Sequence, residues 1–442
     1  MNYYESYKNT NIDFIGKIPS GWSLLPLFTQ CFPTRLDHNG EKTVLSLSYG
    51  RIVNRDIEKN FGLLPNSFDN YQLLLPDFVV LRLTDLQNDK RSLRVGYCET
   101  RGIITPVYLS LGCQNSFLGK YLYYQLHTSD TKKVFYTLGG GLRQTLRFDE
   151  FKRFPLVVPT IPEQHQIVEF LDRKTSQINT LIEKKLRKID LLKEYRTSLI
   201  NHFVTKGLNP NVEMKDSGVE WIGEIPKEWN IVSLKYLVGT KITDGPHETP
   251  EFYDNGIPFL SVESVQDNKL DFNKKRGFIS NEQHEIYSKK CKPMKGDIFI
   301  VKSGSTTGKS TIVETDENFN IWSPICIVRP NQKKIISRFI FCSVQSWYFR
   351  RFIELGWSFG TQPNIGMGVI ENIRLIVPPI PEQRQIVEFL DRKTSQIDTT
   401  IQMETKKIEL LIEYRQSLIS EVVTGKIDVR TETNYELHGE KV

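Results

Sequence analysis

The sequence predicts an α+β protein with an internal pseudo-two-fold repeat, in which two small mixed α/β domains are separated by two long coiled-coil-like helices. Two observations support this prediction. A 40-residue amphipathic segment occurs twice, and each copy follows a stretch of short β-rich runs such as 78–83 and 298–301. The length of 442 residues also exceeds what one ordinary hydrophobic core organises, so more than one domain is expected.

The repeated segment has the pattern of a long helix. Residues 161–200 and 380–419 align at an offset of 219 with 29 of 40 positions identical. Both copies begin Ile-Pro-Glu-Gln, which places proline where its missing N–H costs nothing and glutamate in the positive first turn. Positions that step by alternating fours and threes form a seam repeating about every 3.5 residues, which is typical of a coiled coil. We expect helix pairing through its apolar members, Ile178, Ile182, Ile189, Leu192 and Leu199 in one copy and Ile397, Ile401, Ile408, Leu411 and Leu418 in the other.

An alternative is that each amphipathic helix packs only on its own domain. This is disfavoured because the polar interruptions of the seam, Lys185 and Arg196 against Glu404 and Arg415, keep the same register in both copies. A helix of about 40 residues also spans roughly 60 Å, which is longer than a small domain is wide. The two helices are therefore expected to pack against each other.

Shorter repeats mark the ends of each half. FIGKIPSGW at 14–22 resembles WIGEIPKEW at 221–229, and VTKGL at 204–208 resembles VTGKI at 423–427. The stretches between these repeats share little identity, so one scaffold presents two different domains. The predicted division is a first domain at 1–160, a first helix at 161–207, a second domain at 208–379, a second helix at 380–427 and a tail at 428–442.

Composition excludes some classes of protein. No run of about 18 apolar residues occurs and the N-terminal segment has no apolar core, so we expect a cytoplasmic protein without a membrane span. The net charge of +6 is compatible with a polyanionic partner but does not establish one. The six cysteines lack CxxC pairs or metal-ligand spacing, which predicts reduced thiols and no metal site.

The chain lacks the common catalytic motifs. SGSTTGKS at 303–310 resembles a phosphate-binding loop, but only three residues separate Gly304 from Gly308 where that motif needs four. The residues that follow, Thr311 to Thr315, have the pattern of a strand rather than the required helix. No HExxH, GxSxG or (Asn/Asp)-Pro-Pro-aromatic string occurs either. We expect no catalytic residues, and interpret the loop as one that touches DNA phosphate between two strands.

Both domains carry side chains suited to reading nucleic acid. Arginine pairs with guanine edges while asparagine and glutamine pair with adenine, and nearby glycines let the backbone approach closely. The DNA-binding candidates of the first domain are Tyr49, Arg51, Arg82, Arg91, Arg94, Arg143 and Gln144. Those of the second are Lys241, Asp244, His247, Lys302, Ser303, Ser305, Thr306, Lys309, Thr361, Gln362 and Asn364.

Three features together resemble the specificity subunits of type I restriction–modification enzymes. They are the IPEQ-x-QIVEFLDRKTSQI helix, the IG-x-IP-x-x-W segment, and DGPHETPEF at 244–252 followed by GIPFLSVESV at 256–265. The resemblance covers essentially the whole chain. It implies two target-recognition domains, each reading one half of a bipartite asymmetric DNA site. It further implies that the two helices pack antiparallel, set the spacer between the half-sites and dock the methyltransferase subunits.

The resemblance also implies which chemistry lies elsewhere. The chain is expected to be a non-catalytic subunit that needs no cofactor, with S-adenosylmethionine, ATP and Mg²⁺ on partner subunits. The implied partners are double-stranded DNA, two modification methyltransferase subunits and restriction motor–nuclease subunits. Two alternatives come from other classes: a coiled-coil protein–protein adaptor without DNA readout, and a nucleotide hydrolase built on residues 304–310.

Overall fold

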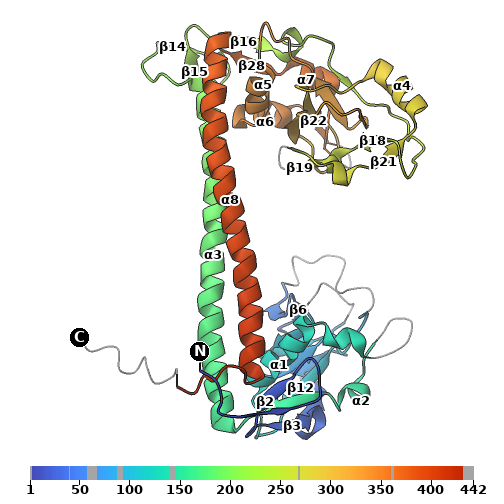
Figure 1. The fold of residues 1–442 in the computed structure, drawn as a ribbon, viewed down its shortest axis with the longest axis vertical. Helices are drawn as coiled ribbons and strands as arrows, with labels where there is room; N and C mark the ends of the chain where they lie inside the picture. The colour runs from blue at the N-terminus through green and yellow to red at the C-terminus, as the bar shows by residue number, and fades with distance from the viewer. Residues whose placement is uncertain are drawn as a thin grey trace. The chain divides into compact units, whose positions relative to one another are not determined.

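The structure is a computed structural model that describes residues 2–38, 40–56, 67–86, 93–138, 145–266, 269–359 and 363–431. The chain forms two compact units. Unit 1 consists of residues 1–185 with 406–442, and unit 2 of residues 186–405. Two long helices, α3 (Ile161–Lys206) and α8 (Ile380–Val423), contribute to both units, and both begin at the residues predicted from the sequence (Figure 1).

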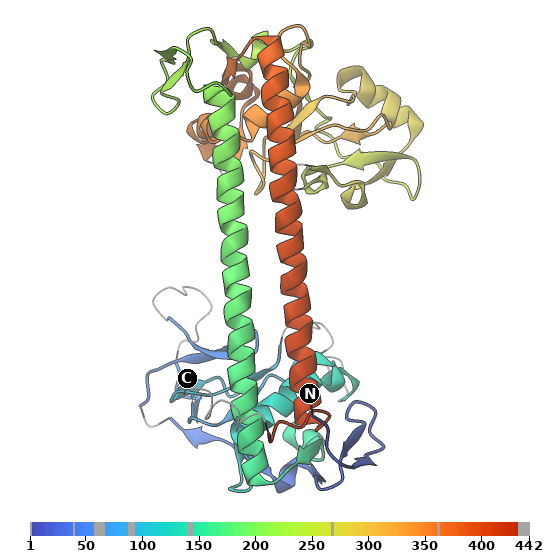
Figure 2. The same ribbon diagram turned by 60° about the vertical axis from the view of Figure 1, so that its left-hand side comes forward.

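The two helices run antiparallel within each unit, side by side in both views (Figures 1 and 2). In unit 2, the Arg196 side chain of α3 pairs with Asp398 of α8 at 2.9 Å, and the rings of Phe203 and Phe389 pack against each other at a tilt of 58°. In unit 1, Arg415 of α8 donates a hydrogen bond to Asn179 of α3. Later residues of one helix thus meet earlier residues of the other, which is the antiparallel order that the resemblance implies.

The residues of the predicted seam are the less exposed ones of the two helices. Five of its ten apolar members are buried and the others are half-buried, whereas most of the intervening helical residues are exposed. The polar interruptions are paired across the seam, as in the ion pair of Lys188 with Glu404 at 2.9 Å. This pairing offsets the desolvation of the charged side chains, since an unpaired charge in the seam would carry a large desolvation cost.

Among its described residues, unit 1 contains a four-stranded and a three-stranded antiparallel sheet and the two-stranded pairs β1–β2, β3–β13 and β6–β7. One sheet has the order β10-β9-β12-β4 and the other β11-β8-β5, while β6 and β7 form a hairpin. The strands are β1 (Tyr7–Asn9), β2 (Lys17–Pro19), β3 (Ser23–Pro26), β4 (Cys31–Thr34), β5 (Leu36–Asp37), β6 (Leu45–Ser48), β7 (Arg51–Asn54), β8 (Gln72–Leu74), β9 (Val79–Leu81), β10 (Val95–Tyr97), β11 (Gly102–Ile104), β12 (Leu109–Cys113) and β13 (Pro155–Val158). Helices α1 (Gly119–Thr131) and α2 (Phe148–Phe151) complete the domain.

Unit 2 has a similar plan with different strands. Its larger sheet has the order β17-β25-β22-β23, and its smaller one β21-β18-β24 includes a parallel pair. The strands are β14 (Met214–Asp216), β15 (Glu224–Pro226), β16 (Asn230–Ser233), β17 (Thr243–Asp244), β18 (Ile257–Leu260), β19 (Val265–Gln266), β20 (Lys269–Leu270), β21 (Gly277–Ile279), β22 (Ile298–Val301), β23 (Ser310–Ile312), β24 (Asn320–Ile321), β25 (Ile325–Val328), β26 (Trp357–Phe359), β27 (Pro363–Ile365) and β28 (Arg374–Val377). The helices are α4 (Asn281–Lys290), α5 (Ser337–Val344), α6 (Trp347–Leu355) and α7 (Met367–Asn372). The α+β class and the internal repeat are therefore confirmed.

The repeated motifs form the same hydrogen bonds in both units. The indole Nε1 of Trp22 donates to Glu163 in the first turn of α3, and that of Trp229 donates to Glu382 in the first turn of α8, each at 2.9 Å. The glutamine that follows each glutamate is also used alike, since Gln164 accepts from a backbone N–H of unit 1 as Gln383 does in unit 2. A carboxylate at a helix N-terminus is favoured by the helix dipole, and in each unit the indole N–H donates one hydrogen bond to it; Glu163 also accepts one from the Tyr4 hydroxyl. The repeated sequence therefore encodes the same arrangement twice: a long helix whose first-turn glutamate binds the tryptophan of the segment 14–22 or 221–229. We call this repeated arrangement the frame.

A glycine follows each long helix. Gly207 and Gly425 have φ angles of 75° and 70°, the left-handed conformation that ends a helix and favours glycine. A Cβ atom on Gly425 would lie 2.4 Å from Pro19, and one on Gly207 would lie 3.0 Å from Trp229. Both positions are thus fixed by conformation and by close packing. Within the described ranges, no helix has the length and apolar character needed to cross a membrane.

Candidate DNA interface

The Gly/Ser/Thr-rich segment of unit 2 is a loop between two antiparallel strands. Residues 302–309 join β22 to β23, and the N–H groups of Val301 and Gly308 close the turn by donating to the carbonyls of Lys309 and Val301. Gly304 and Gly308 have φ angles of 101° and 89°, which residues with side chains rarely adopt. The predicted strand after the loop is confirmed, and no helix follows it. This geometry excludes the strand-to-helix arrangement of a nucleotide-binding P-loop.

A second segment, distant in sequence, packs on this loop. The N–H of Gly304 donates to the carbonyl of Pro363, and that of Ile365 donates to the carbonyl of Lys302 at 2.7 Å. Ser303 and Asn364 form an isolated β-bridge. The structure therefore brings these two predicted residues together. The neighbouring candidates Thr361 and Gln362 lie outside the described residues.

Asp244 is the centre of a charge cluster beside the loop. Its carboxylate is almost buried and lies 3.0 Å from the ammonium of Lys302, 2.7 Å from that of Lys290 and 3.2 Å from the ring of His247. Three of these four residues were predicted from the sequence. Lys290, the last residue of α4, was not predicted. The only feature of the sequence that could have pointed to it is its position in the last turn of a helix, where basic residues are favoured.

Asp244 keeps its negative charge at neutral pH. Burial alone raises the pKa of Asp244, but hydrogen bonds and charges from Lys290 and Lys302 outweigh it and leave the pKa below its usual range. Because one carboxylate meets two ammonium groups, the cluster carries excess positive charge. A site of this kind is suited to a phosphate group, which carries the charge that dominates DNA affinity.

The other candidates of unit 2 lie around this cluster with different exposure. Ser305 and Lys309 are exposed on the loop, whereas Thr306 is half-buried and its Oγ1 meets no hydrogen-bond partner among the described residues. Lys241 is exposed but lines a separate depression of about 350 Å³ with Lys235 and Glu371. The loop and the Asp244 cluster are thus the parts that converge.

In unit 1, two described candidates lie together on the β6–β7 hairpin. Tyr49 and Gly50 occupy its two-residue turn with φ angles of 47° and 76°, the pattern of a type I′ turn. The Tyr49 side chain is 84% exposed at the tip, and Arg51 is exposed beside it. An exposed aromatic ring next to an arginine matches the chemistry of base and phosphate contact.

A second arginine approaches this hairpin from α8. Burial raises the pKa of Tyr123, and the positive charges of Arg415 and Arg51 partly oppose that rise, so both guanidinium groups lie near the phenol. Burial and the charge of Arg51 also lower the pKa of Arg415. Sequence reasoning placed Arg415 only in the helix seam. Its proximity to the hairpin is a product of folding.

Arg94 corrects the sequence-based prediction. It was expected to contact DNA, but it is 0% exposed. Its guanidinium donates to the backbone carbonyls of Arg82, Thr84 and Asp85 and to the Tyr136 hydroxyl. The side chain therefore organises the polypeptide inside unit 1 and is unavailable to a ligand.

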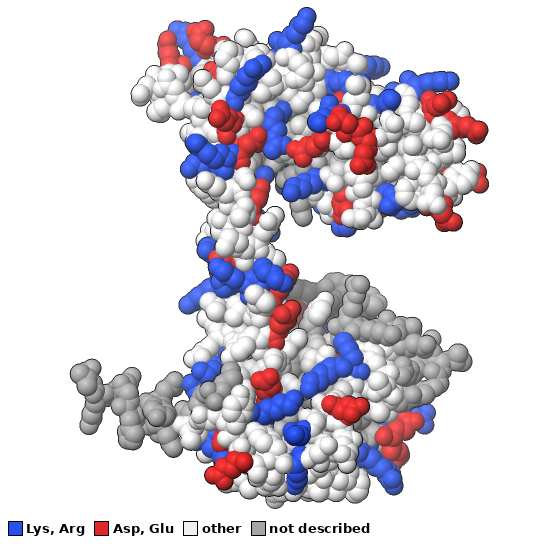
Figure 3. All heavy atoms as spheres, viewed as in Figure 1, with Lys and Arg blue, Asp and Glu red and all other residues white. Residues whose placement is uncertain are grey.

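Of the remaining candidates of unit 1, only Arg82 lies among the described residues. Arg82 is half-buried, close enough to Asp130 to help lower the pKa of that carboxyl against the stronger effect of burial. Arg91, Arg143 and Gln144 lie outside the described residues. On the face shown in Figure 3, lysine and arginine side chains are interspersed with aspartate and glutamate over each unit. On this face, positive charge is therefore concentrated only in small local groups of lysine and arginine side chains.

The buried His127 predicts a pH dependence of stability. It stacks on Tyr123, and burial, with a contribution from Arg415, lowers its pKa from 6.5 to about 4. The unfolded chain therefore takes up a proton near pH 6.5, whereas the folded chain does so only near pH 4. Stability is expected to fall across this window as the pH is lowered, by up to about 3 kcal/mol.

Urea unfolding at pH 7 and pH 4.5 measures this effect. His127→Gln should flatten the dependence, and His165→Gln, at an exposed position of α3, is the control. Equal pH dependence in the wild type and His127→Gln would contradict the assignment.

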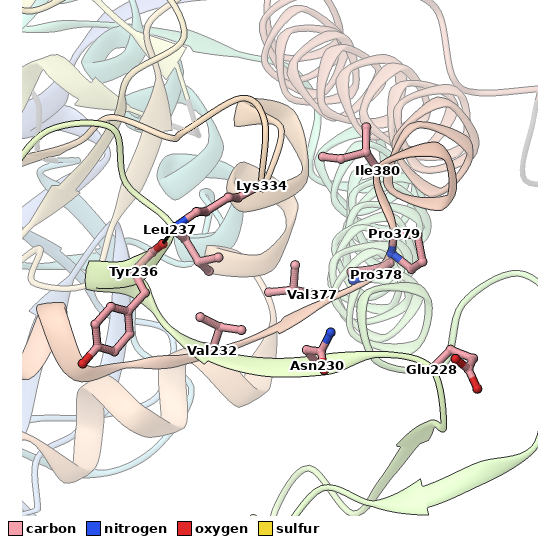
Figure 4. Close-up of a pocket in the computed structure, with 10 residues that line it drawn as sticks. All are labelled: Glu228, Asn230, Val232, Tyr236, Leu237, Lys334, Val377, Pro378, Pro379 and Ile380. Carbon is pink, nitrogen blue, oxygen red and sulfur yellow. Dashed lines mark hydrogen bonds between the residues drawn. The ribbon is translucent and has the colours of Figure 1, made fainter.

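A depression of about 390 Å³ lies where β16, β28 and the start of α8 meet in unit 2 (Figure 4). Its charged lining residues are Glu228 and Lys334, which lie toward opposite ends, and the ammonium of Lys334 donates to the carbonyl of Tyr236 at 3.0 Å. These groups do not form an acid–base pair. Among the described residues, no group of three His, Cys, Asp or Glu side chains could hold a metal ion.

A duplicated helical frame that carries two different loop surfaces defines a two-domain protein with an internal repeat. The chain matches the model of the type I restriction modification DNA specificity domain over residues 110–191 and 226–411, more than half of its length. It is 25% identical over 336 residues to the type I restriction enzyme MjaVIII specificity subunit of Methanocaldococcus jannaschii, covering 75% of each chain. It is 21% identical over 282 residues to the type I restriction enzyme EcoBI specificity subunit of Escherichia coli, covering 62% of this chain and 58% of that one.

A solved chain from work on the "structural basis underlying complex assembly and conformational transition of the type I R-M system" has the same fold. The TM-score is 0.67 at 15% identity, over 93% of this chain and 99% of that chain. The protein belongs to the type I restriction modification DNA specificity family. Its function is accordingly that of a DNA sequence-specificity subunit of a type I restriction–modification system.

Proposed function

We propose that each unit binds one half of a bipartite, asymmetric DNA site. The observation that carries this proposal is the contrast between the frame and the surfaces. The Trp–Glu hydrogen bonds of the frame are the same in both units, whereas unit 1 displays the Tyr49–Arg51 hairpin and unit 2 the loop 302–309 beside Asp244. Two different surfaces on one repeated frame are suited to two different sequences, which makes the whole site asymmetric.

The helices then have a role in spacing. α3 and α8 are continuous over 46 and 44 residues, and each contributes to both units. We propose that their length sets the number of unread base pairs between the half-sites. The chemistry would belong to partner chains: two modification methyltransferase subunits and the restriction motor–nuclease subunits, which would bind S-adenosylmethionine, ATP and Mg²⁺. This chain is proposed to be non-catalytic.

Exposed apolar side chains on the helices support docking of two equivalent partners. Leu191 and Tyr195 of α3 are 48% and 55% exposed, and their repeat counterparts Leu410 and Tyr414 of α8 are 51% and 48% exposed. Each pair lies four residues apart and so shares one helix face. The seam does not need these residues, yet the repeat retains them in both copies. Partly exposed tyrosines are frequent anchors of protein interfaces.

We therefore expect Leu191→Lys with Tyr195→Lys to release one methyltransferase subunit from the complex, and the matched pair at 410 and 414 to release the other. Each affinity should fall about tenfold or more, since removal of an anchor costs about 2 kcal/mol. Native mass spectrometry of the purified complex measures the subunit count. Leu186→Lys is the matched control, because Leu186 is equally exposed at 48% but its repeat counterpart is Thr405. Full occupancy in both double variants would refute the docking proposal.

DNA reading is tested one unit at a time. Methylation-sensitive long-read sequencing of a host that carries the complete system defines the wild-type site. Tyr49→Ala with Arg51→Ala should then relax base preference in one half-site, and Ser305→Ala with Lys309→Ala in the other. Each pair should weaken binding about tenfold and reduce the salt slope by about one for each phosphate that is no longer neutralised. Lys227→Ala, at an exposed frame lysine, is the control.

These outcomes also separate the proposal from its alternative. A protein–protein adaptor without DNA readout would show no half-site-specific change and no salt-dependent footprint. If both variant pairs altered both halves equally, the assignment of one half-site to each unit would be wrong.

A further inference from the structure

Two cysteines of unit 1 face each other across neighbouring strands. Cys31 of β4 lies opposite Cys113 of β12 in the antiparallel register, and their sulfur atoms are 3.7 Å apart. All six cysteines of the chain carry thiols. Cys31 and Cys113 are far apart in sequence, so nothing in their spacing indicated a pair.

The backbone geometry at this pair is the one that a cross-strand disulfide can use. The neighbouring pair is joined by the bond from the Gln114 N–H to the Gln30 carbonyl, so Cys31 and Cys113 occupy the non-hydrogen-bonded position next to it. The Cα atoms of such a pair lie about 4.5 Å apart, inside the range of about 4.4–6.8 Å found for disulfides. Rotation about the side-chain bonds can therefore bring the sulfurs to bonding distance without moving the strands.

The two thiols differ in their access to solvent. Cys31 is 1% exposed, whereas Cys113 is half-buried at the end of β12 and is followed by the exposed residues Gln114 and Asn115. The other cysteines lack this arrangement; the buried Cys98, for example, donates to the Thr100 carbonyl. A small oxidant can thus reach the Cys113 sulfur first, while the buried Cys31 sulfur lies in contact with it.

We propose that Cys31 and Cys113 are a redox-sensitive dithiol that hydrogen peroxide converts into an intrachain disulfide within unit 1. Peroxide first oxidises the Cys113 thiol to a sulfenic acid and releases one water. The Cys31 sulfur then attacks the Cys113 sulfur; the S–O bond breaks, the S–S bond forms, and the hydroxyl leaves with the Cys31 proton as a second water. Two thiols are oxidised by two electrons and one peroxide is reduced to two waters.

The electrostatics of the pair agree with this order. The hydrogen bond with Cys113 and burial raise the pKa of the Cys31 thiol, which makes Cys31 a poor first nucleophile. Its role is to resolve the sulfenic acid, for which contact matters most. The disulfide would fix β4 to β12 in the larger sheet of unit 1 and close a long loop of the chain. This inference does not depend on the proposed DNA function.

The test uses the full chain purified under reducing conditions. Denatured protein should titrate with six thiols before peroxide treatment and four afterwards, because the chain has six cysteines. Peptide mapping without reduction should show Cys31 joined to Cys113, with a mass two hydrogens below the sum of the peptides. A reductant should restore six thiols, and the midpoint of thermal unfolding should be higher in the oxidised form.

Variants sharpen the result. Cys113→Ala should keep all five of its thiols under the same treatment, whereas Cys98→Ala, the matched control in the same unit, should still form the bridge. Retention of six titratable thiols in the oxidised wild type would overturn the proposal. So would a disulfide that joins Cys31 to any other cysteine while Cys113 remains alkylatable. Both outcomes are read from the wild type, so they hold even if a variant folds poorly.

Discussion

Replacement of Trp229 by alanine is expected to lower the free energy of unfolding of unit 2 by about 4 kcal/mol. Trp229 is 1% exposed in the hydrophobic core of that unit, and its indole N–H is bound to Glu382. The substitution leaves a large cavity and deprives a carboxylate in the first turn of α8 of its donor. Both losses act at the same place, where the segment 221–229 packs on the first turn of α8.

Denaturant unfolding monitored by hydrogen exchange measures the effect unit by unit. Trp22→Ala, the repeat-related change, should destabilise unit 1 by a similar amount, because Trp22 is 3% exposed and bound to Glu163. Trp229→Phe is the matched control, since it keeps most of the volume and loses the hydrogen bond. A loss of less than about 1 kcal/mol in Trp229→Ala would show that this contact does not stabilise the unit.

Replacement of Arg94 by alanine is expected to destabilise unit 1 by about 3 kcal/mol or more. Its guanidinium donates to three partly buried backbone carbonyl groups and to the Tyr136 hydroxyl, and the substitution removes this donor from all four acceptors. An unsatisfied buried polar group costs about 1–3 kcal/mol, and neighbouring losses add only in part. Arg94→Lys should recover little, because one ammonium cannot reach acceptors spread around a planar guanidinium.

Urea unfolding of the purified chain measures this prediction without DNA present. Arg101→Ala is the control, because Arg101 is exposed and its ion pair with Glu41 is at the surface, where such pairs contribute about 1 kcal/mol or less. If Arg94→Ala unfolded like the wild type but bound DNA weakly, the original prediction of a DNA contact would be restored.

Local periodicity explains what could be predicted from sequence. The start of α3 at Ile161, the start of α8 at Ile380 and the seam between them follow from proline placement and apolar spacing within one segment. The strand after Lys309 was likewise predicted from its β-rich pattern. Each of these features depends on residues that are neighbours in the chain, so one sequence suffices to find it.

The candidate interface was predictable only in part. Asp244, His247 and Lys302 were selected for their residue types and nearby glycines, and the fold does bring them together. Lys290 was missed because it reaches Asp244 of β17 from helix α4, 46 residues away in the sequence. Arg94 was misassigned because a charged side chain that is fully buried by backbone acceptors looks, in sequence, like any surface arginine.

The sequence by itself determined two long helices with a matched seam and the repeated segments at 14–22 and 221–229, whereas the hydrogen bonds that join each tryptophan to a first-turn glutamate came from the tertiary structure. These features could be determined because the two copies of the repeat can be compared with each other. Only the tertiary structure decided which polar residues of the divergent domains face solvent, which are held inside, and which cysteines meet. Those outcomes depend on contacts between segments distant in sequence, where the free energy of burial and hydrogen bonding, rather than local pattern, selects the partners.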